Sequence, residues 1–183
     1  MACQHFADRF LGVPTSPQPD PGVTRRSRHR GTSIDEAPVG SLLLQVLRAH
    51  ALLGTEMLRR VGLVPPHEIL LMYLDEHGSL AQSDLVYYMG RDRSTVTNTL
   101  QAMERAELIA RMPSPTDKRA MVVSLTAKGL RAVPVARETW RQLETITTTG
   151  LTDGQRGTLV AALTIMRDEL NQAIDAAALT RTP

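Results

Sequence analysis

The chain has 183 residues, enough for one domain or for one domain with a tail. Hydrophobic residues make up 42% and charged residues 22%, a balance that argues against a disordered polymer, and no apolar stretch approaches the roughly 20 residues of a membrane-spanning helix. Aromatic residues make up only 3%, so aliphatic side chains and methionine must fill the core, which favours helices over a β-sandwich or barrel. The net charge of +2 permits nucleic-acid binding without demanding it.

The first 37 residues differ from the rest in composition. Repeated prolines and a basic run from Arg25 to Arg30 predict a disordered tail, because too few apolar residues are present to offset the entropy of ordering. A solvated tail is one interpretation, and a basic arm on DNA phosphates is the other. The sequence shows no signal-peptide pattern, and its single cysteine, Cys3, has no intrachain partner, so we expect a cytoplasmic protein. The five histidines are scattered without metal-ligand spacing, so no metal or cofactor is expected.

The next segment is predicted to be helical. Apolar residues recur at helical spacing from Val39 to Val61 and predict a long helix with a broad buried face. Gly62, followed by two prolines, ends this helix, and a second is expected from about Pro66 to Glu76.

Two short helices follow. Ser79–Gln82 has the sequence of a capping box, so the third helix is expected to begin at Ser79 or Leu80 and to end near Met89–Gly90. Asp92 offers an N-cap for a fourth helix, from Arg93 to about Arg105. Two short helices across a glycine turn are typical of a helix-turn-helix.

Beyond the fourth helix the pattern changes to extended runs. Leu108–Met112 and Ala120–Leu125 flank a segment with two prolines and several turn residues, which predicts a β-hairpin. A hairpin directly after a helix-turn-helix is a wing.

The chain is predicted to end in two more helices. Thr126 can cap the fifth helix, which Pro134 should kink or rearrange, and Thr152–Gln155 is another capping box before a sixth. The first helix and these last two carry wide Leu-rich stripes, more apolar surface than one small lobe could cover, which predicts a dimerisation region. Packing within one chain is the alternative.

The outward face of the fourth helix is polar. Its members are short or planar hydrogen-bonding side chains, flanked by Arg91 and Arg93: Ser94, Thr95, Asn98 and Gln101. A helix in the DNA major groove needs such groups near its N-terminus to reach base edges and phosphates. The alternative is that each one is ordinary solvated surface.

The stretch from Gly40 to about Leu130 resembles the multiple antibiotic resistance regulator (MarR) family of bacterial transcription factors in several short segments. The matching segments are Gly62-Leu63 before Pro65-Pro66, then Leu80–Leu85 and Arg91–Thr97, and finally the wing signature Ser114–Arg119 that leads into Val123–Gly129. They occur in the order expected for the family and cover half the chain.

The resemblance implies a mainly α fold with a small β-wing: a winged helix-turn-helix with six helices and terminal helices for dimerisation. Residues 38–178 would form this domain, with 63–126 as the DNA-binding module and 38–62 and 127–178 as dimerisation helices. It further implies a homodimeric repressor on a palindromic operator in double-stranded DNA, with the fourth helix in the major groove and the wing beside the minor groove. The implied DNA contacts are Arg91, Arg93, Ser94, Thr95, Thr97, Asn98, Gln101, Arg111, Lys118 and Arg119. Asp117 would be structural, since an acid facing phosphate repels it and one paired with an arginine would hold the hairpin.

The chain departs from the family pattern just after the fourth helix. Where the family usually has glycine, this chain reads Arg105-Ala106-Glu107-Leu108. A helix end in the left-handed region suits glycine, and glutamate there should cost about 1 kcal/mol.

The resemblance also implies a small-molecule effector, since members of the family often lose DNA affinity when a small aromatic or phenolic acid binds beside the DNA-reading module. The residues that could line such a site are His50, Met57, His67, Met72 and Tyr73, with core or surface filling as the alternative role. Cys3 does not match the cysteine position through which some members sense oxidants.

Two other classes of function compete with a regulator. An enzyme is disfavoured because the sequence has no phosphate-binding glycine loop, zinc-protease motif or nucleophile elbow. A winged protein-interaction module without DNA reading would more naturally have an apolar or aromatic surface where the fourth helix is polar.

Overall fold

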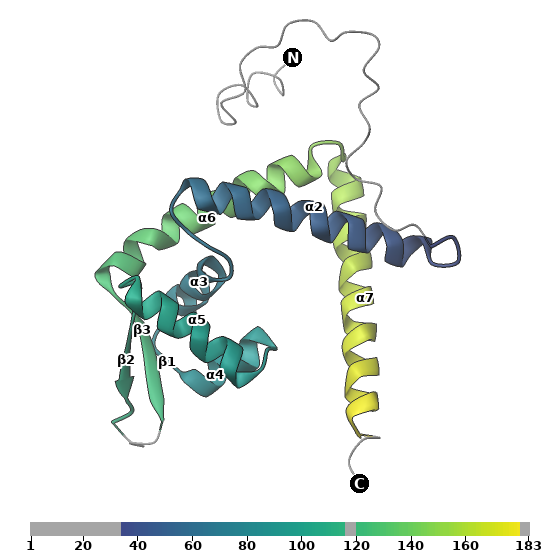
Figure 1. Ribbon diagram of the computed structural model, residues 1–183. Helices are drawn as coiled ribbons and strands as arrows, with labels where there is room; N and C mark the ends of the chain where they lie inside the picture. The colour runs from purple at the N-terminus through teal and green to yellow at the C-terminus, as the bar shows by residue number, and fades with distance from the viewer. Residues whose placement is uncertain (1–33, 116–119, 180–183) are drawn as a thin grey trace, which may run out of the picture. The chain divides into compact units, whose positions relative to one another are not determined.

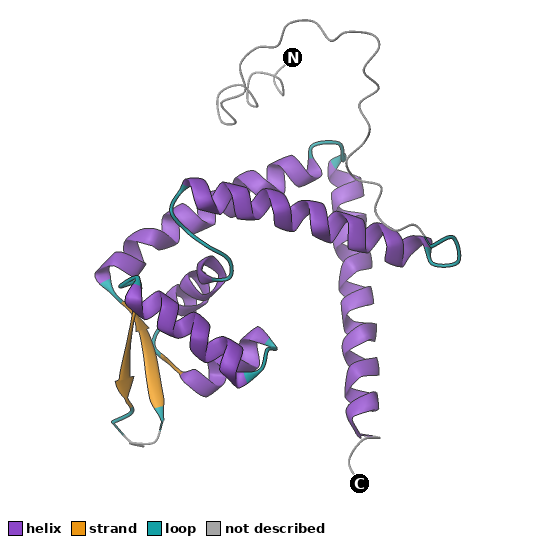
Figure 2. Ribbon diagram, viewed as in Figure 1, coloured by secondary structure: helices purple, strands orange, loops and turns teal. Residues whose placement is uncertain are grey.

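The computed structural model describes residues 34–115 and 120–179. The fold is mainly α with one small antiparallel sheet, as the sequence predicts (Figures 1 and 2). In chain order the elements are α2 (Pro38–Arg60), α3 (His67–His77), β1 (Leu80–Ala81), α4 (Gln82–Met89), α5 (Arg93–Arg105), β2 (Ile109–Pro113), β3 (Met121–Leu125), α6 (Ala127–Thr148) and α7 (Asp153–Leu179).

The chain divides into two compact units between residues 45 and 46, so the first turns of α2 belong to the N-terminal unit. There the buried Ser41 hydroxyl accepts a hydrogen bond of 2.9 Å from the backbone N–H of Ile34. The remainder of α2 and all later elements belong to the larger unit. In neither unit does a described helix combine the length and apolar character that a membrane span requires.

The predicted hairpin is present and gains a third strand. β2 and β3 pair antiparallel from Ile109 opposite Leu125 to Pro113 opposite Met121. β1 pairs with the other edge of β3, with Leu80 opposite Val123 (Figure 1). The sheet order is therefore β1-β3-β2.

The third strand corrects the predicted start of the third helix. Leu80 and Ala81 are extended, α4 begins only at Gln82, and its N-cap Ala81 makes no side-chain capping bond. The capping box expected at Ser79–Gln82 does not form, because β3 takes the backbone of these residues into the sheet.

The other predicted N-terminal caps are confirmed. The Asp92 carboxylate accepts a hydrogen bond of 2.9 Å from the Thr95 N–H at the start of α5, and the Thr126 hydroxyl accepts one of 3.0 Å from Gly129 at the start of α6. Thr152 and Gln155 bond reciprocally before α7. α6 continues through Pro134 as one helix.

The core of the larger unit is aliphatic, as the composition requires. Its fully buried side chains come from three helices, α3, α4 and α5, and from the central strand β3: Leu70, Leu71, Leu74, Leu85, Val96, Leu100, Met103 and Val123. α3 packs against α6, and α5 packs against β2. At the junction of α6 with the wing, a Cβ on Gly129 would overlap the carbonyl oxygen of Leu108, so this close approach requires glycine.

Apolar side chains of the terminal helices remain exposed in a single copy. On α2 only Leu58 of the predicted buried stripe is fully covered, whereas Val39 and Val46 are more than half exposed. On α7 the exposed apolar residues are Leu159, Val160, Leu163, Ile165, Leu170 and Ile174. The first helix is long, as predicted, but its broad apolar face is only partly covered within a single copy.

Candidate functional site

The fourth predicted helix, α5, has the two faces that the sequence indicates. Val96, Leu100 and Met103 are fully buried, while Asn98 and Gln101 are exposed. This division follows the helical period, since the apolar residues recur three and four positions apart. The polar face is thus held outward by the packing of the opposite face.

The N-terminus of α5 is organised around Asp92. Its carboxylate accepts hydrogen bonds from the backbone N–H of Thr95, from the Thr95 hydroxyl at 2.6 Å and from the Ser94 hydroxyl. These donors hold the pKa of Asp92 well below its usual range. The hydroxyl groups of Ser94 and Thr95 therefore donate their protons to Asp92. Their oxygens can still accept hydrogen bonds from DNA.

Two further predicted DNA contacts are joined inside the module by Gln82. The Gln82 amide donates to the Thr97 hydroxyl at 3.0 Å, and its carbonyl accepts from the Arg111 guanidinium at 3.1 Å. Thr97 in turn donates to the carbonyl of Arg93, and Arg111 also lies 3.5 Å from Glu104. This network links α4, α5 and β2.

The Arg111 side chain is largely buried and contacts other residues of the chain. Its side chain is only 14% exposed, and its Nε finds no hydrogen-bond partner among residues 34–115 and 120–179. Gln82 was missed as a positioning residue because its sequence context suggested a capping box. Its partners lie 15 and 29 positions away, which local patterns do not reveal.

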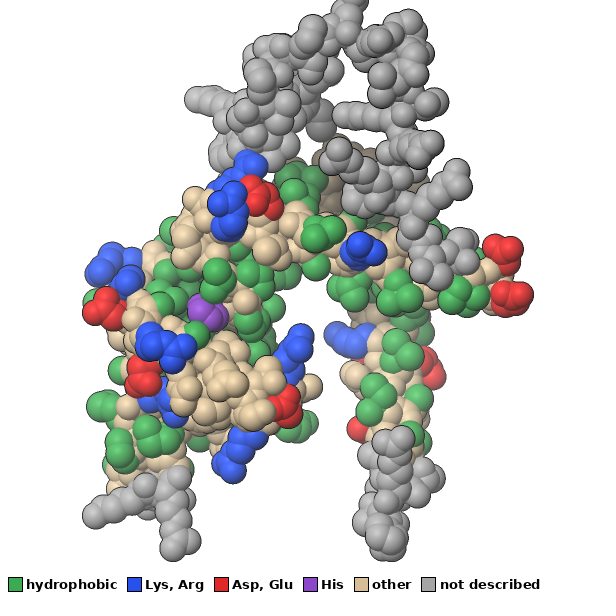
Figure 3. Space-filling model, in the orientation of Figure 1, with side chains coloured by type: hydrophobic (Ala, Val, Ile, Leu, Met, Phe, Trp, Pro, Cys, Tyr) green, Lys and Arg blue, Asp and Glu red, His purple; other side chains and the backbone are tan. Residues whose placement is uncertain are grey.

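The basic side chains are spread over the module. Arg91 and Arg93 are exposed on either side of the Asp92 cap, and Figure 3 shows Lys and Arg side chains on the α4–α5 surface together with acidic ones. Asp117, Lys118 and Arg119 lie outside the described residues.

Tyr87, near the end of α4, was not predicted as a site residue and is 91% exposed. A phenol presented on the first helix of a helix-turn-helix is suited to a phosphate oxygen, because that helix crosses the DNA backbone. The sequence signal was its place on the helix, two residues beyond the buried Leu85.

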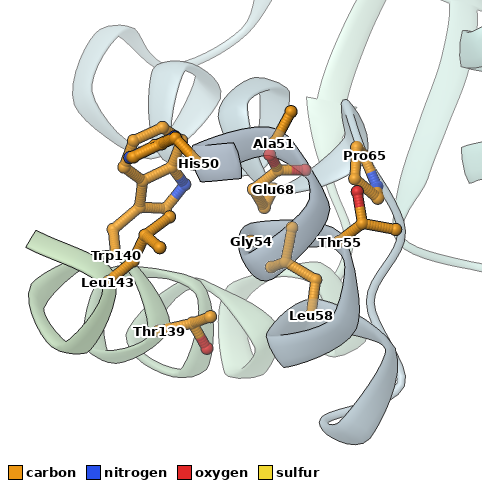
Figure 4. Close-up of a pocket in the computed structure, with 10 residues that line it drawn as sticks. All are labelled: His50, Ala51, Gly54, Thr55, Leu58, Pro65, Glu68, Thr139, Trp140 and Leu143. Carbon is orange, nitrogen blue, oxygen red and sulfur yellow. The ribbon is translucent and has the colours of Figure 1, made fainter. Parts of the chain in front are cut away.

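A second feature of the larger unit is a cavity of about 180 Å³ (Figure 4). It is bounded by the second half of α2, the loop after it, the start of α3 and the middle of α6. Its lining residues are His50, Ala51, Gly54, Thr55, Leu58, Pro65, Glu68, Thr139, Trp140 and Leu143. Gly54 lets α2 approach α6, since a Cβ there would lie only 3.1 Å from a methyl group of Leu143.

The cavity contains one of the five predicted ligand residues. His50 lines it, with its ring centroid 5.8 Å from that of Trp140. His67 is buried elsewhere, and burial lowers its pKa. Tyr73 stacks on Tyr88 with a centroid separation of 3.5 Å. The last two predicted residues, Met57 and Met72, are half-buried outside the lining.

Glu68 is the unexpected member of the lining. It is only 3% exposed, and its Oε2 has no hydrogen-bond partner within the described residues. Burial raises the pKa of this carboxyl, against the opposing effect of the backbone N–H groups of Glu68 and Ile69 in the first turn of α3. A buried acid with an unpaired oxygen costs free energy, which marks it as a functional candidate.

Comparisons with known proteins agree with this architecture. The MarR family model matches residues 66–121. The transcriptional repressor NicR of Pseudomonas putida is 25% identical over 151 residues, which cover 79% of this chain and 94% of NicR. The repressor MdtR of Bacillus subtilis is 34% identical over 74 residues, which cover 40% of this chain and 48% of MdtR.

Solved structures show the same fold. A mutant of MarR from E. coli complexed with operator DNA superimposes with a TM-score of 0.66 and 22% identity, covering 70% of this chain and 93% of that chain. Bordetella bronchiseptica BpsR, whose DNA binding is regulated by 6-hydroxynicotinic acid, gives 0.67 and 25%, covering 75% of this chain and 99% of BpsR. The motifs, the fold and these relatives lead to one conclusion, that this chain is a DNA-binding regulator similar to those of the MarR family.

Proposed function

We propose that this regulator acts as a homodimeric repressor of a palindromic operator and that a small aromatic ligand releases it from DNA. The observation that carries the proposal is the polar face of α5. Asn98 and Gln101 are exposed there above a fully buried apolar face, and amide side chains are suited to adenine edges in the major groove.

The dimer is supported by the apolar surface of α7. Six of its large apolar side chains from Leu159 to Ile174 are 42–64% exposed, which is unusual for a lone helix in water. A two-fold dimer buries the same patch on both copies and presents two reading helices to successive major grooves.

The ligand response is supported by the cavity at His50 and Trp140. It is lined by α3, which packs inside the DNA-reading module, and by the longer helices α2 and α6. A ligand that prefers one arrangement of these helices shifts the population toward it and so changes the spacing of the two α5 helices. The DNA binding of BpsR is regulated by 6-hydroxynicotinic acid, a one-ring acid, and a cavity of about 180 Å³ has room for one ring.

Selection of bound sequences from random duplex DNA tests the proposal. The purified full chain, at a stated near-physiological salt concentration, is expected to enrich a palindrome whose half-sites lie about one helical turn apart. Weak, salt-sensitive binding with no enriched sequence would overturn it in favour of a protein-interaction module.

A further inference from the structure

The cavity beside Trp140 has a size and an apolar wall that suit a small ring. Its volume is about 180 Å³. An apolar protein cavity of about 150 Å³ is known to hold one benzene ring. Leu58, Leu143 and the indole of Trp140 provide apolar contacts for such a ring.

The polar side chains of the lining are few: His50, Thr55, Glu68, Thr139 and Trp140. The Thr139 hydroxyl donates to the carbonyl of Val135 at 2.9 Å. The ring centroid of His50 lies 5.8 Å from that of Trp140. Among the lining residues, the polar atom that is buried without a hydrogen-bond partner in the described part of the chain is Oε2 of Glu68, and Figure 4 shows this carboxylate among the lining side chains.

The charge of the lining decides which ligand groups are tolerated. None of its ten residues is Lys or Arg. A ligand carboxylate would lose its hydration and meet the Glu68 carboxyl with no Lys or Arg in the lining to compensate it, which is costly in an apolar site. A ligand ammonium would supply both the missing hydrogen-bond donor and the opposite charge.

We propose that this cavity binds a one-ring molecule bearing a primary amine, whose nitrogen donates to Oε2 of Glu68 while the ring lies among Leu58, Trp140 and Leu143. The inference rests on the proposed ligand response, whose effector chemistry it specifies. It differs from the aromatic acid that the family resemblance implies, and the reason is Glu68, a residue of this chain's own lining.

Three probes of matched shape test the inference: benzylamine, benzyl alcohol and benzoate. Trp140 is the only tryptophan of the chain, so its fluorescence reports directly on the cavity. Titration of the full-length protein near neutral pH is expected to show saturable binding of benzylamine, at least tenfold tighter than either of the other two.

The variant Glu68→Gln keeps the side chain's shape and removes its charge, and it should abolish the preference for benzylamine. The matched control Glu144→Gln changes an exposed acid of α6 outside the lining and should retain the preference. Benzoate or benzyl alcohol binding as tightly as benzylamine would overturn the inference, as would no saturable binding of benzylamine or a preference that survives Glu68→Gln. These wild-type titrations decide the matter even if the variant fails to fold.

Release of operator DNA is measured separately with the same probe. Benzylamine that binds at Trp140 without weakening DNA binding would overturn the proposed ligand response and leave the assigned chemistry of the cavity intact.

Discussion

The DNA-reading module (residues 63–126) and helix α7 differ in the burial of their apolar residues. In the module, Leu100 and Val123 are completely buried by the chain's own helices and sheet. On α7, Leu170 and Ile174 are 57% and 63% exposed although the helix runs for 27 residues. The interior of the module is therefore covered within one copy, whereas α7 carries an exposed apolar surface that the proposed dimer would cover, and the two regions should respond differently to the same kinds of mutation.

The largest expected effect is on the interior of the module. Leu100→Ala removes a fully buried side chain and should lower the free energy of unfolding by about 2–5 kcal/mol, measured by chemical denaturation. The matched truncation Leu170→Ala on α7 should change the unfolding of the module by less than about 0.5 kcal/mol. Equal losses of unfolding free energy for the two variants would show that the two regions do not differ in the burial of their apolar residues.

A charge placed on α7 tests the other half of the comparison. Leu163→Glu should weaken the dimer about a hundredfold in dissociation constant, because the carboxylate would be buried without a partner, and sedimentation measures this directly. Gln172→Glu puts the same charge at an exposed polar position of the helix and serves as the control. A dimer that tolerates Leu163→Glu would place the interface elsewhere.

Within the module, the exposed face of α5 should separate base reading from phosphate contact. Asn98→Ala is expected to cost about 1–3 kcal/mol of binding free energy at particular base pairs of the operator, measured with single-substitution probes. Arg93→Ala should instead weaken all sequences alike and reduce the salt dependence of binding. A uniform loss for Asn98→Ala would make it a backbone contact.

The smallest expected effect is a gain in stability at the end of α5. Glu107 has a φ of 58°, in the left-handed region that the sequence predicted for this position. Glu107→Gly should stabilise the module by about 1 kcal/mol, seen as a raised melting temperature, because glycine has no Cβ to strain there. Its exposed ion pair with Lys128, at 3.5 Å, contributes little.

Glu107→Ala is the control for this gain, since it removes the ion pair and keeps the Cβ. It should therefore fail to stabilise. A melting temperature that Glu107→Gly leaves unchanged or lowers would contradict the argument from strain.

The sequence predicted those parts of the fold that depend on nearby residues. Asp92 and Thr126 cap the helices that follow them, and both hydrogen-bond partners lie three residues away. Ser79–Gln82 has an equally good local pattern, but it fails because β3, some forty residues later, takes Leu80 and Ala81 into the sheet. Local capping is decided within one turn of helix, whereas strand pairing depends on the whole fold.

The candidate sites divide in the same way. The polar face of α5 follows from helical period alone, so Asn98 and Gln101 could be named in advance. The cavity is formed where the consecutive helices α2 and α3 pack with α6, which lies far along the chain, so four of the five predicted ligand residues lie outside it and Glu68 and Trp140 were missed. Hydrophobic periodicity in the sequence does not reveal a single acidic residue, such as Glu68, that tertiary packing buries.

The amide of Gln82 restricts movement of the reading helix α5 relative to the wing. One planar group holds Thr97 of α5 on its nitrogen and Arg111 of β2 on its oxygen, so tilting the reading helix against the wing must break one of these bonds. In the proposed dimer, each copy would therefore meet its half-site with the reading helix and the wing in a fixed relative position. The adjustment left to the proposed effector is the separation of the two copies, so operators with altered half-site spacing should be discriminated more sharply than operators with altered groove width.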